Sequence, residues 1–509
     1  MKTTRRDAIK LAASLSAPSL SAQPLKKSTQ PHILLLMADQ WRGDCLGADG
    51  NRVVHTPHLD RLAAEGARFS HAYSSTPTCT PARSALLTGL SPWNHGMLQM
   101  IPMAIRYPFE KPRAMRDAGY HTAIVGKNHY HPQRNAHGYE EMLVDESGRV
   151  ESPEFRSDYR SWFWSMAPNL DPDVTGLGWN DYRGRPYALP ERLHPTAWIG
   201  DTAVRFIETY NRNQPIFLKV SFERPHSPYD PPERFWRMYQ NANLPPAQVG
   251  KWAAKYAPRN SSENDIWHGD VGPAEVRTSR QGYYGSISFV DEQIGRILEA
   301  LEKRHLLDET LILFLSDHGD MTGDQNLWRK SYAYEPSARI PMLVRWPTGL
   351  LSASRGQVLP QSVEIRDVLP TFLDAAGVSD YPKLDGKSLL QLIAGKTDNW
   401  RPYIDLEHGI CYSPTNHWNA LTDGREKYIY DAYDGSEQFF SLERDPHELN
   451  DLASEPSAAQ RVSEWRNRMI AHLAPRGEAY VKNGRLIPRP QNMPTSPNFP
   501  GNHSTEPRP

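Results

Sequence analysis

The chain has 509 residues, of which 39% are hydrophobic, so it can bury one large core or a large core with a smaller one beside it. It carries 58 basic and 59 acidic residues, and a net charge of −1 excludes an overall basic field that would recruit nucleic acid or an anionic membrane. Three cysteines, Cys45, Cys79 and Cys411, are too few for a disulfide framework, although they leave open a single Cys45–Cys411 bridge.

Residues 1–23 have the layout of an export signal. A basic start is followed by a short, weakly apolar stretch and a small-residue Leu-Ser-Ala site. Arg5 and Arg6 are typical of a twin-arginine signal, and an ordinary export signal that carries two arginines is the alternative. The stretch is too short and too polar to span a bilayer, and no later apolar run reaches that length. We therefore expect an exported protein, periplasmic or extracellular, that binds neither membrane nor nucleic acid.

Four short apolar runs each end in a polar cluster, which is the rhythm of an α/β fold with a parallel sheet. The runs are His32 to Ala38, His121 to Val125, Pro215 to Phe222 and Thr310 to Leu315. Helical patterns follow at His58 to Glu65, Phe289 to Lys303 and Val368 to Ala376. Because open α/β sheets place ligands at the carboxyl ends of their strands, the four polar clusters predict one shared site.

The character of the sequence changes after Asp385-Gly386. We predict a catalytic domain over residues 24–385 and a smaller C-terminal domain over residues 386–475. Short alternating stretches in the second, such as 427–430 and 439–442, are typical of an antiparallel sheet. Residues 476–509 are rich in Pro, Asn and Gly, and we predict an irregular or disordered tail.

The strongest local signal is the segment from Cys79 to Gly89, CTPARSALLTG. It places a cysteine at a loop-to-helix junction, a proline in the first helical turn and Arg83 one turn on, which makes an anion site with a sulfur at its mouth. A buried structural cysteine is the alternative that an isolated Cys would favour. The pattern C-x-P-x-R-x-x-x-x-T-G resembles that of the sulfatase family, in which a modifying enzyme oxidises the cysteine to formylglycine.

Further motifs appear in the order expected for that family, between about Pro31 and Ser454. They are Gly126-Lys127-Asn128-His129, Pro225-His226-Ser227-Pro228, Ser316-Asp317-His318-Gly319, Lys330 with Tyr334-Glu335 and Ile340-Pro341, Asp367-Val368-Leu369-Pro370-Thr371, Leu384-Asp385-Gly386-Lys387-Ser388-Leu389 and Asp445-Pro446-His447-Glu448-Leu449-Asn450. The resemblance implies an α/β fold of the alkaline-phosphatase type. Such a fold has a mixed, mostly parallel sheet flanked by helices, with a smaller C-terminal domain that contains an antiparallel sheet. It also implies a sulfuric ester hydrolase.

The same resemblance implies one divalent metal bound by Asp39, Gln40, Cys79, Asp317 and His318. Many sulfatases have two aspartates where this chain has Asp39-Gln40, so the site loses one negative charge, and His318 adds a nitrogen ligand where the family also has asparagine. Ca²⁺ is therefore the first expectation and Mn²⁺ the alternative. We interpret Asp44, Asp320 and Asp324 as turn groups or as groups that support the ligands.

The family's chemistry implies a role for each remaining motif residue. The hydrated formylglycine at position 79 supplies the nucleophile, and Arg83 and Lys127 hold the hydrate. Lys127 and Lys330 neutralise the sulfate oxygens. His226 protonates the leaving alcohol with Lys330 as its partner, and His129 takes a proton from the second hydroxyl when sulfate is expelled. His226 or Lys330 in isolation would more often be an ordinary polar residue or a solvated charge.

The substrate is predicted to be a sulfated carbohydrate, because a long insert between Tyr159 and Trp198 is rich in aromatic residues and arginines. Aromatic faces can stack on sugar rings, and Arg183 and Arg185 can pair with a uronate carboxylate or a second sulfate. Simple packing of the insert is the alternative for each of these residues. Three other functions remain open: an aryl or alkyl sulfatase, a phosphonate or phosphate ester hydrolase of the same superfamily, and a sulfated-glycan binding protein with a decayed site.

Overall fold

The structure is a computed structural model, and it describes residues 30–146, 149, 151–152 and 154–502. The predicted export signal lies outside these residues. Eight strands form the main sheet in the order β4-β3-β5-β1-β6-β7-β2-β8. They are β1 His32–Asp39, β2 Ala67–Tyr73, β3 His121–Gly126, β4 Glu141–Val144, β5 Ile216–Pro225, β6 Thr310–Ser316, β7 Met342–Arg345 and β8 Gln357–Glu364.

The four strands predicted from apolar runs lie side by side as β3, β5, β1 and β6, and all their pairings are parallel. Strand β7 runs antiparallel to both of its neighbours, β6 and β2. The predicted mixed, mostly parallel sheet is therefore confirmed. Because the carboxyl ends of β3, β5, β1 and β6 meet at one edge, the polar residues after these strands gather there.

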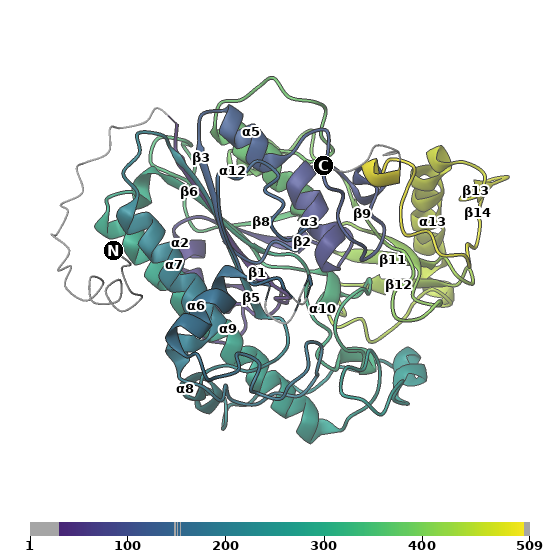
Figure 1. The fold of residues 1–509 in the computed structure, drawn as a ribbon. Helices are drawn as coiled ribbons and strands as arrows, with labels where there is room; N and C mark the ends of the chain where they lie inside the picture. Colours follow the sequence, from purple (N-terminus) through teal and green to yellow (C-terminus); the bar gives the residue numbers. More distant parts are fainter. Residues whose placement is uncertain (1–29, 147–148, 150, 153, 503–509) are drawn as a thin grey trace, which may run out of the picture.

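Helices cover both faces of this sheet (Figure 1). One face is covered by α2 Pro57–Ala64, α6 Asp158–Met166, α7 Pro195–Thr209 and α9 Pro273–Lys303, with α8 Glu233–Met238 packed on α9. The other face is covered by α3 Cys79–Thr88, α5 Lys111–Asp117, α11 Val368–Ala375 and α12 Leu389–Ile393. Two single-turn helices, α4 Pro92–His95 and α10 Glu335–Ala338, complete this domain.

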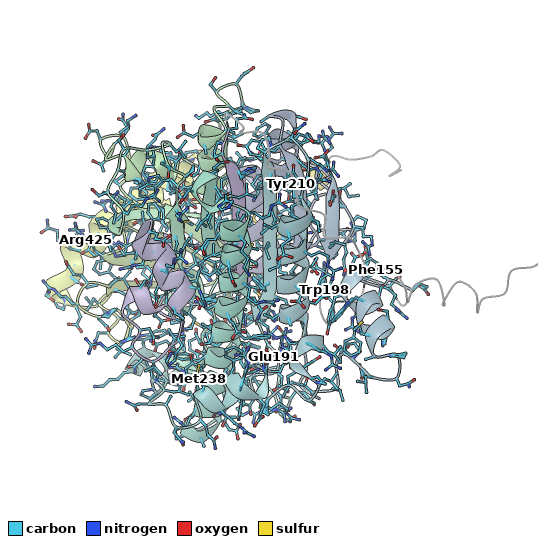
Figure 2. All side chains as sticks on the ribbon, turned by 90° about the vertical axis from the view of Figure 1, so that its left-hand side faces the viewer. Phe155, Glu191, Trp198, Tyr210, Met238 and Arg425 are labelled. Carbon is cyan, nitrogen blue, oxygen red and sulfur yellow. The ribbon has the colours of Figure 1, made fainter. Side chains whose placement is uncertain are left out.

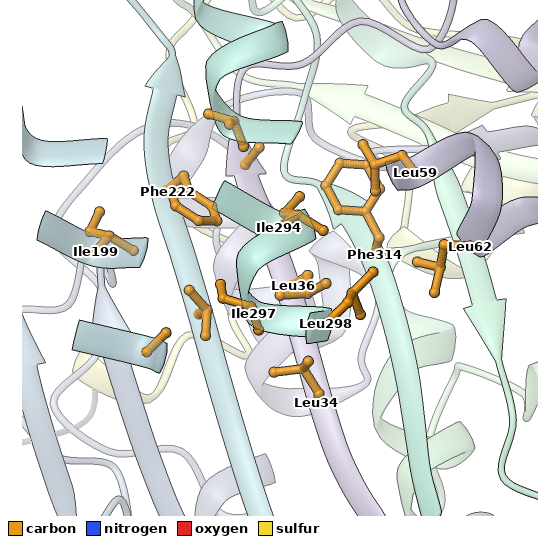
Figure 3. Packing of buried hydrophobic residues seen from close by; sticks show 14 of the residues in the cluster. Leu34, Leu36, Leu59, Leu62, Ile199, Phe222, Ile294, Ile297, Leu298 and Phe314 are labelled. Carbon is orange, nitrogen blue, oxygen red and sulfur yellow. The ribbon is translucent and has the colours of Figure 1, made fainter. Parts of the chain in front are cut away.

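The side chains of β1 alternate between two hydrophobic cores, as the period of a strand requires. Leu34 and Leu36 contact the first core, where they meet Ile294 of α9 and Phe314 of β6 (Figure 3). Figure 2 looks onto the outside of this layer, with Trp198 in α7 and Tyr210 just beyond the end of that helix. Ile33, Leu35 and Met37 contact the second core. Strand β1 is thus buried on both faces, which holds its carboxyl end in place.

The C-terminal part has its own antiparallel sheet, in the order β12-β11-β10-β9, with helix α13 beside it. The strands are β9 Ile404–His408, β10 Trp418–Thr422, β11 Glu426–Asp431 and β12 Glu437–Ser441, and the helix is α13 Ala459–Leu473. This confirms the predicted antiparallel sheet. Helix α12, which follows residue 386, packs in the main core, and the predicted boundary between residues 385 and 386 stays a prediction.

Residues 476–502 are irregular apart from a short hairpin, β13 Val481–Lys482 with β14 Arg485–Leu486. They nevertheless fold back onto the catalytic domain, where Ser496 Oγ donates a hydrogen bond to the carbonyl of Trp93 at 2.6 Å and Phe499 is buried. No helix among the described residues is long and apolar enough to cross a membrane.

All three cysteines are free thiols, so the Cys45–Cys411 bridge that the sequence left open does not form. The two residues belong to different parts of the fold. Cys45 is buried in the core on the α9 side of the main sheet, whereas Cys411 lies in the loop between β9 and β10.

Candidate active site

Four of the five predicted metal ligands come together at the carboxyl edge of the main sheet. Asp39 is the last residue of β1, Cys79 is the first of α3, and Asp317 and His318 directly follow β6. One ligand atom from each residue lies within 4.8 Å of the others, and all four side chains are buried. Two carboxylates, an imidazole and a sulfur at this spacing form a set that a divalent cation can bind.

The ring orientation of His318 suits metal binding. Its Nδ1 lies 2.9 Å from the carbonyl of Gly319, to which it donates a hydrogen bond. Its Nε2 faces the cluster, 3.1 Å from Cys79 Sγ and 3.6 Å from Asp39 Oδ1. In metal-binding histidines, one ring nitrogen usually donates a hydrogen bond to a backbone carbonyl or a carboxylate, and the other ring nitrogen binds the metal.

Arg83 holds the two carboxylates of this cluster. Its Nε donates to Asp317 Oδ2 at 2.8 Å, and one terminal nitrogen reaches Asp39 Oδ2 at 3.2 Å. The other terminal nitrogen donates to the carbonyl of Lys127 at 2.8 Å. The contacts thus show Arg83 orienting the metal-type ligands, and its predicted role toward the formylglycine hydrate stays a prediction.

Lys127 follows β3 and reaches the same carboxylate, with Nζ 2.6 Å from Asp39 Oδ2. Burial alone would raise the pKa of Asp39, but the charges of Lys127 and Arg83 hold that pKa well below its ordinary value. Asp39 is therefore ionised, which is the state that a metal ligand needs.

The side chain of Gln40 makes hydrogen bonds that the sequence analysis did not predict. Its Oε1 accepts a hydrogen bond from Lys330 Nζ at 2.7 Å, and its Nε2 donates to Asp320. Because lysine can only donate and an ionised carboxylate can only accept, these partners determine which end of the amide is oxygen. The oxygen expected on the metal is occupied by Lys330 here, so metal ligation by Gln40 stays a prediction. Asp320, which we interpret as a supporting group, accepts the hydrogen bond from Gln40 and so orients its amide.

His226 and Lys330 form the pair expected for proton delivery. Lys330 Nζ lies 2.8 Å from His226 Nε2, and His226 Nδ1 lies 2.7 Å from the carbonyl of Ser227. His226 therefore donates from Nδ1 and accepts from the lysine at Nε2. Burial, together with Lys330 and Lys127, lowers the pKa of His226 well below its ordinary value, so the ring is neutral. In this arrangement the available proton is on Lys330.

His129 is buried with its Nδ1 unpaired among the described residues. Its backbone amide donates to Glu146 Oε1 at 2.6 Å, and its φ of 59° lies in the left-handed region. Gln40 has a similar φ of 68°. Such conformations are costly for residues other than glycine and often occur at functional sites.

The aromatic insert contributes Trp179 to the site. Its indole stacks on the ring of His226 with centroids 4.5 Å apart. The two arginines predicted to bind substrate make other contacts: Arg183 pairs with Asp181 at 2.6 Å, and Arg185 donates to the carbonyl of Thr175 at 3.0 Å. Their role toward substrate stays a prediction.

The smaller C-terminal unit also reaches the site, through a residue that the sequence analysis missed. His408, the last residue of β9, contacts Thr78 Oγ1 through its Nε2. Thr78 directly precedes Cys79, and its hydroxyl also lies 3.0 Å from Ser331 Oγ, next to Lys330. No sequence motif around His408 signals this role, because the contact joins residues 330 positions apart.

Comparison with known proteins agrees with this geometry. The family model described as "Sulfatase" matches residues 31–378, which include all the site residues up to Lys330. The chain belongs to the sulfatase family. A second model, described as "N-sulphoglucosamine sulphohydrolase, C-terminal", matches residues 323–474 of this sulfatase.

Curated relatives of this sulfatase include an arylsulfatase of Clostridium perfringens, which is 36% identical and covers 90% of this chain and 97% of the relative. A choline-sulfatase of Rhizobium meliloti is 32% identical, with 87% of each chain covered. Among solved structures, the phosphonate monoester hydrolase of Agrobacterium radiobacter superimposes with a TM-score of 0.74 at 26% identity, over 90% of this chain and all of that one. The chain is thus a sulfuric ester hydrolase with the alkaline-phosphatase-like fold, and its family implies a metal and a formylglycine.

Proposed function

We propose that this sulfatase hydrolyses the sulfate ester of a carbohydrate, with Cys79 converted to formylglycine by a modifying enzyme and one divalent metal at the neighbouring ligands. The observation that supports it best is the buried group of Asp39, Cys79, Asp317 and His318, with all four ligand atoms within 4.8 Å. Lys127 and Lys330 are the two cations expected to bind sulfate. Lys127 contacts Asp39 of this group, and Lys330 contacts the neighbouring Gln40.

The donor set fits a divalent cation, because two carboxylates supply charge and His318 directs its Nε2 inward. The bound metal and the formylglycine hydrate would together supply a hydroxyl that ionises near neutral pH and attacks sulfur. Ca²⁺ is the metal we propose, and Mn²⁺ is the alternative because a nitrogen ligand suits borderline cations. Gln40 Oε1, which accepts one hydrogen bond from Lys330, is proposed as a further oxygen ligand beside Asp39, Asp317, His318 and residue 79.

The chain's own residues divide the remaining work. Lys127 and Lys330 place two positive charges where sulfate oxygens would lie, which stabilises charge that develops as the ester bond breaks. Lys330 hydrogen bonds to His226, so the pair can pass a proton to the leaving oxygen and is left neutral. His129, whose Nδ1 has no hydrogen-bond partner in the part of the chain that the structure describes, is the base proposed for release of sulfate.

The carbohydrate substrate is supported by the aromatic insert, because Trp179 lies against His226, where the alcohol would leave. Export supports it as well: we propose that residues 1–23 direct the enzyme to the periplasm or the exterior, where sulfated polymers are found. A second candidate function is hydrolysis of phosphonate or phosphate esters, which the match to a phosphonate monoester hydrolase favours.

One experiment separates these possibilities. Enzyme produced together with a formylglycine-generating enzyme is incubated with sulfated mono- and disaccharides, 4-nitrophenyl sulfate and a phosphonate monoester, and released sulfate or phosphonate is measured. We expect the highest kcat/KM on a saccharide sulfate. Preference for the phosphonate would favour the second function, and turnover of aryl sulfate alone would contradict the carbohydrate proposal.

A further inference from the structure

Trp179 forms part of the outer wall of the active site. Its indole stacks on His226, and Lys127 Nζ lies 4.9 Å from the centroid of the same ring. The carbonyl of Trp179 accepts a hydrogen bond from Ser227 Oγ at 2.8 Å, which anchors its backbone beside His226. His226 and Cys79 are each only 1% exposed, whereas Trp179 is half-buried. An alcohol that takes a proton from the His226–Lys330 pair therefore leaves next to this indole.

A cavity of about 200 Å³ lies along Trp179. Its wall combines aromatic rings, two ion pairs and small apolar residues, and consists of Tyr159, Arg160, Pro172, Asp173, Thr175, Leu177, Trp179, Tyr187, Pro195, Arg224, Pro228 and Asp230. Pockets for drug-sized ligands usually occupy roughly 300–1,000 Å³. A cavity below that range has room for a single ring and not for an oligosaccharide.

The charges that line this cavity are paired. Arg160 reaches Asp173 at 2.7 Å, and Arg224 reaches Asp230 at 2.8 Å. Arg224 also lies 3.2 Å from Glu223, which is not part of the wall. Arginines held by carboxylates have little attraction left for a uronate or a second sulfate, and paired carboxylates have little for a quaternary ammonium. The oxygens and N–H groups of such pairs can still hydrogen bond to hydroxyls, while tyrosine and tryptophan faces stack on a ring.

We propose that Trp179 and this cavity form the leaving-group subsite, which binds the neutral, hydroxylated ring of one sulfated sugar unit. The inference rests on the proposed carbohydrate function and adds the class of sugar and the residues that select it. Trp179 is a specificity-determining residue in this scheme, because it contacts the ring whose oxygen is released.

The test compares Trp179→Ala with the unmodified enzyme on four substrates: a neutral monosaccharide sulfate, a uronate sulfate, choline sulfate and 4-nitrophenyl sulfate. We expect kcat/KM on the neutral sugar to fall by about tenfold or more, mainly through KM. The loss on nitrophenyl sulfate should be smaller than the loss on the sugar, because its leaving group has no hydroxyls that hydrogen bond to the cavity wall and departs without a proton. Trp179→Phe should recover most of the loss, since it retains an aromatic face.

Two further variants exclude a structural explanation. Leu177→Trp fills the cavity while Trp179 is retained, and it should raise KM for the neutral sugar but not for nitrophenyl sulfate. Trp164→Ala removes a half-buried tryptophan of the same insert that does not line the cavity, so it should behave as the unmodified enzyme. Inhibition by inorganic sulfate and the thermal unfolding midpoint report whether the anion site and the fold are intact in each variant.

The failures can be told apart. Equal losses on every substrate, or no effect of Leu177→Trp, would overturn the subsite and leave the carbohydrate function standing. A preference for uronate sulfate or choline sulfate that depends on Trp179 would overturn the proposal that the bound ring is neutral. No saccharide turnover by the unmodified enzyme would overturn both proposals.

Discussion

Two buried clusters of charged residues in this molecule differ in how their polar atoms are arranged. In the first, which joins the two units, Lys427 of β11 lies between Glu335 of α10 and Glu448 of the loop after β12. Its Nζ is 2.8 Å from Glu335, 2.9 Å from Glu448 and 2.7 Å from the carbonyl of Ala333. One central cation thus satisfies three acceptors from both units.

The active site has the opposite arrangement. Its carboxylates, sulfur and imidazole face one another, while Arg83 and Lys127 contact the carboxylates on their Oδ2 atoms, away from His318 Nε2. A buried charged group acts in structure when each of its atoms has its own partner, and it is a candidate for chemistry when ligand atoms converge. Substitutions in the two clusters should therefore affect different properties of the protein.

Replacement of Cys79 by alanine should abolish turnover while the fold is retained. We expect kcat/KM to fall by about 10⁴-fold or more, because the nucleophile itself is lost. A single small side chain contributes little to stability, so the thermal unfolding midpoint should stay close to that of the unmodified enzyme. Mass spectrometry of the peptide that contains Cys79 should show an aldehyde in place of the thiol. An active enzyme whose Cys79 is wholly unmodified would refute the mechanism.

Asp317→Asn should remove metal, whereas Asp324→Asn should not. Asp317 belongs to the converging group, and its loss should lower kcat/KM by about 100-fold or more together with metal content. Asp324 is a buried partner of Arg42 and Arg280, at 2.8 and 2.6 Å, so its replacement should destabilise the fold and leave the metal in place. Elemental analysis and thermal unfolding measure the two effects. A stoichiometric divalent ion in Asp317→Asn would count against the assignment.

Lys427→Met should destabilise the protein by about 3–5 kcal/mol, because it leaves two buried glutamates without their cation. Chemical denaturation measures this loss. The folded fraction should keep the kcat of the unmodified enzyme, since none of the described contacts of Lys427 involves a residue of the active site. A large drop in kcat with unchanged stability would show that the joining cluster takes part in catalysis.

Glu448→Gln should have the smallest effect, at most about 1 kcal/mol at neutral pH, because with a pKa of about 7 this residue is already about half protonated there. Burial, and secondly the charge of Glu335 against the opposing effect of Lys427, raises the pKa of Glu448 from 4.5 to about 7. Between these values the native state binds more protons at this residue than the unfolded chain, so its contribution to stability decreases as pH rises. The variant should therefore gain relative to the unmodified enzyme from pH 5 to 8. If the difference in unfolding free energy between the two proteins stays constant from pH 5 to 8, this prediction is wrong.

The sequence predicted the parts of the fold whose signals are local. Apolar runs located β1, β3, β5 and β6, and the antiparallel sheet followed from the alternation around Lys427. Helix α9 was recognised only from Phe289 although it begins at Pro273, because its first half buries polar residues and glycines such as Ser279 and Gly282. Those residues hide the helical period that apolar residues would show.

Only the site residues that lie in local sequence motifs could be predicted. Sequence motifs assigned Cys79, Asp317 and His318 to one site, because each residue lies in or directly after a recognisable segment. The contacts of Gln40 with Lys330 and of His408 with Thr78 join residues about 300 positions apart, so no local pattern reports them. Trp179 was one of many aromatic residues in the insert, and only its position against His226 distinguishes it.

The packing of helix α3 has a consequence for the order of events in the life of this protein. All ten of its residues are buried, and Thr78 in front of it is held by His408 from the C-terminal unit. Another enzyme cannot reach Cys79 once these contacts have formed, so the proposed conversion to formylglycine has to precede the docking of the C-terminal unit. Under the proposed twin-arginine export, in which a folded protein is transported, both events take place in the cytoplasm, before the enzyme reaches its substrate.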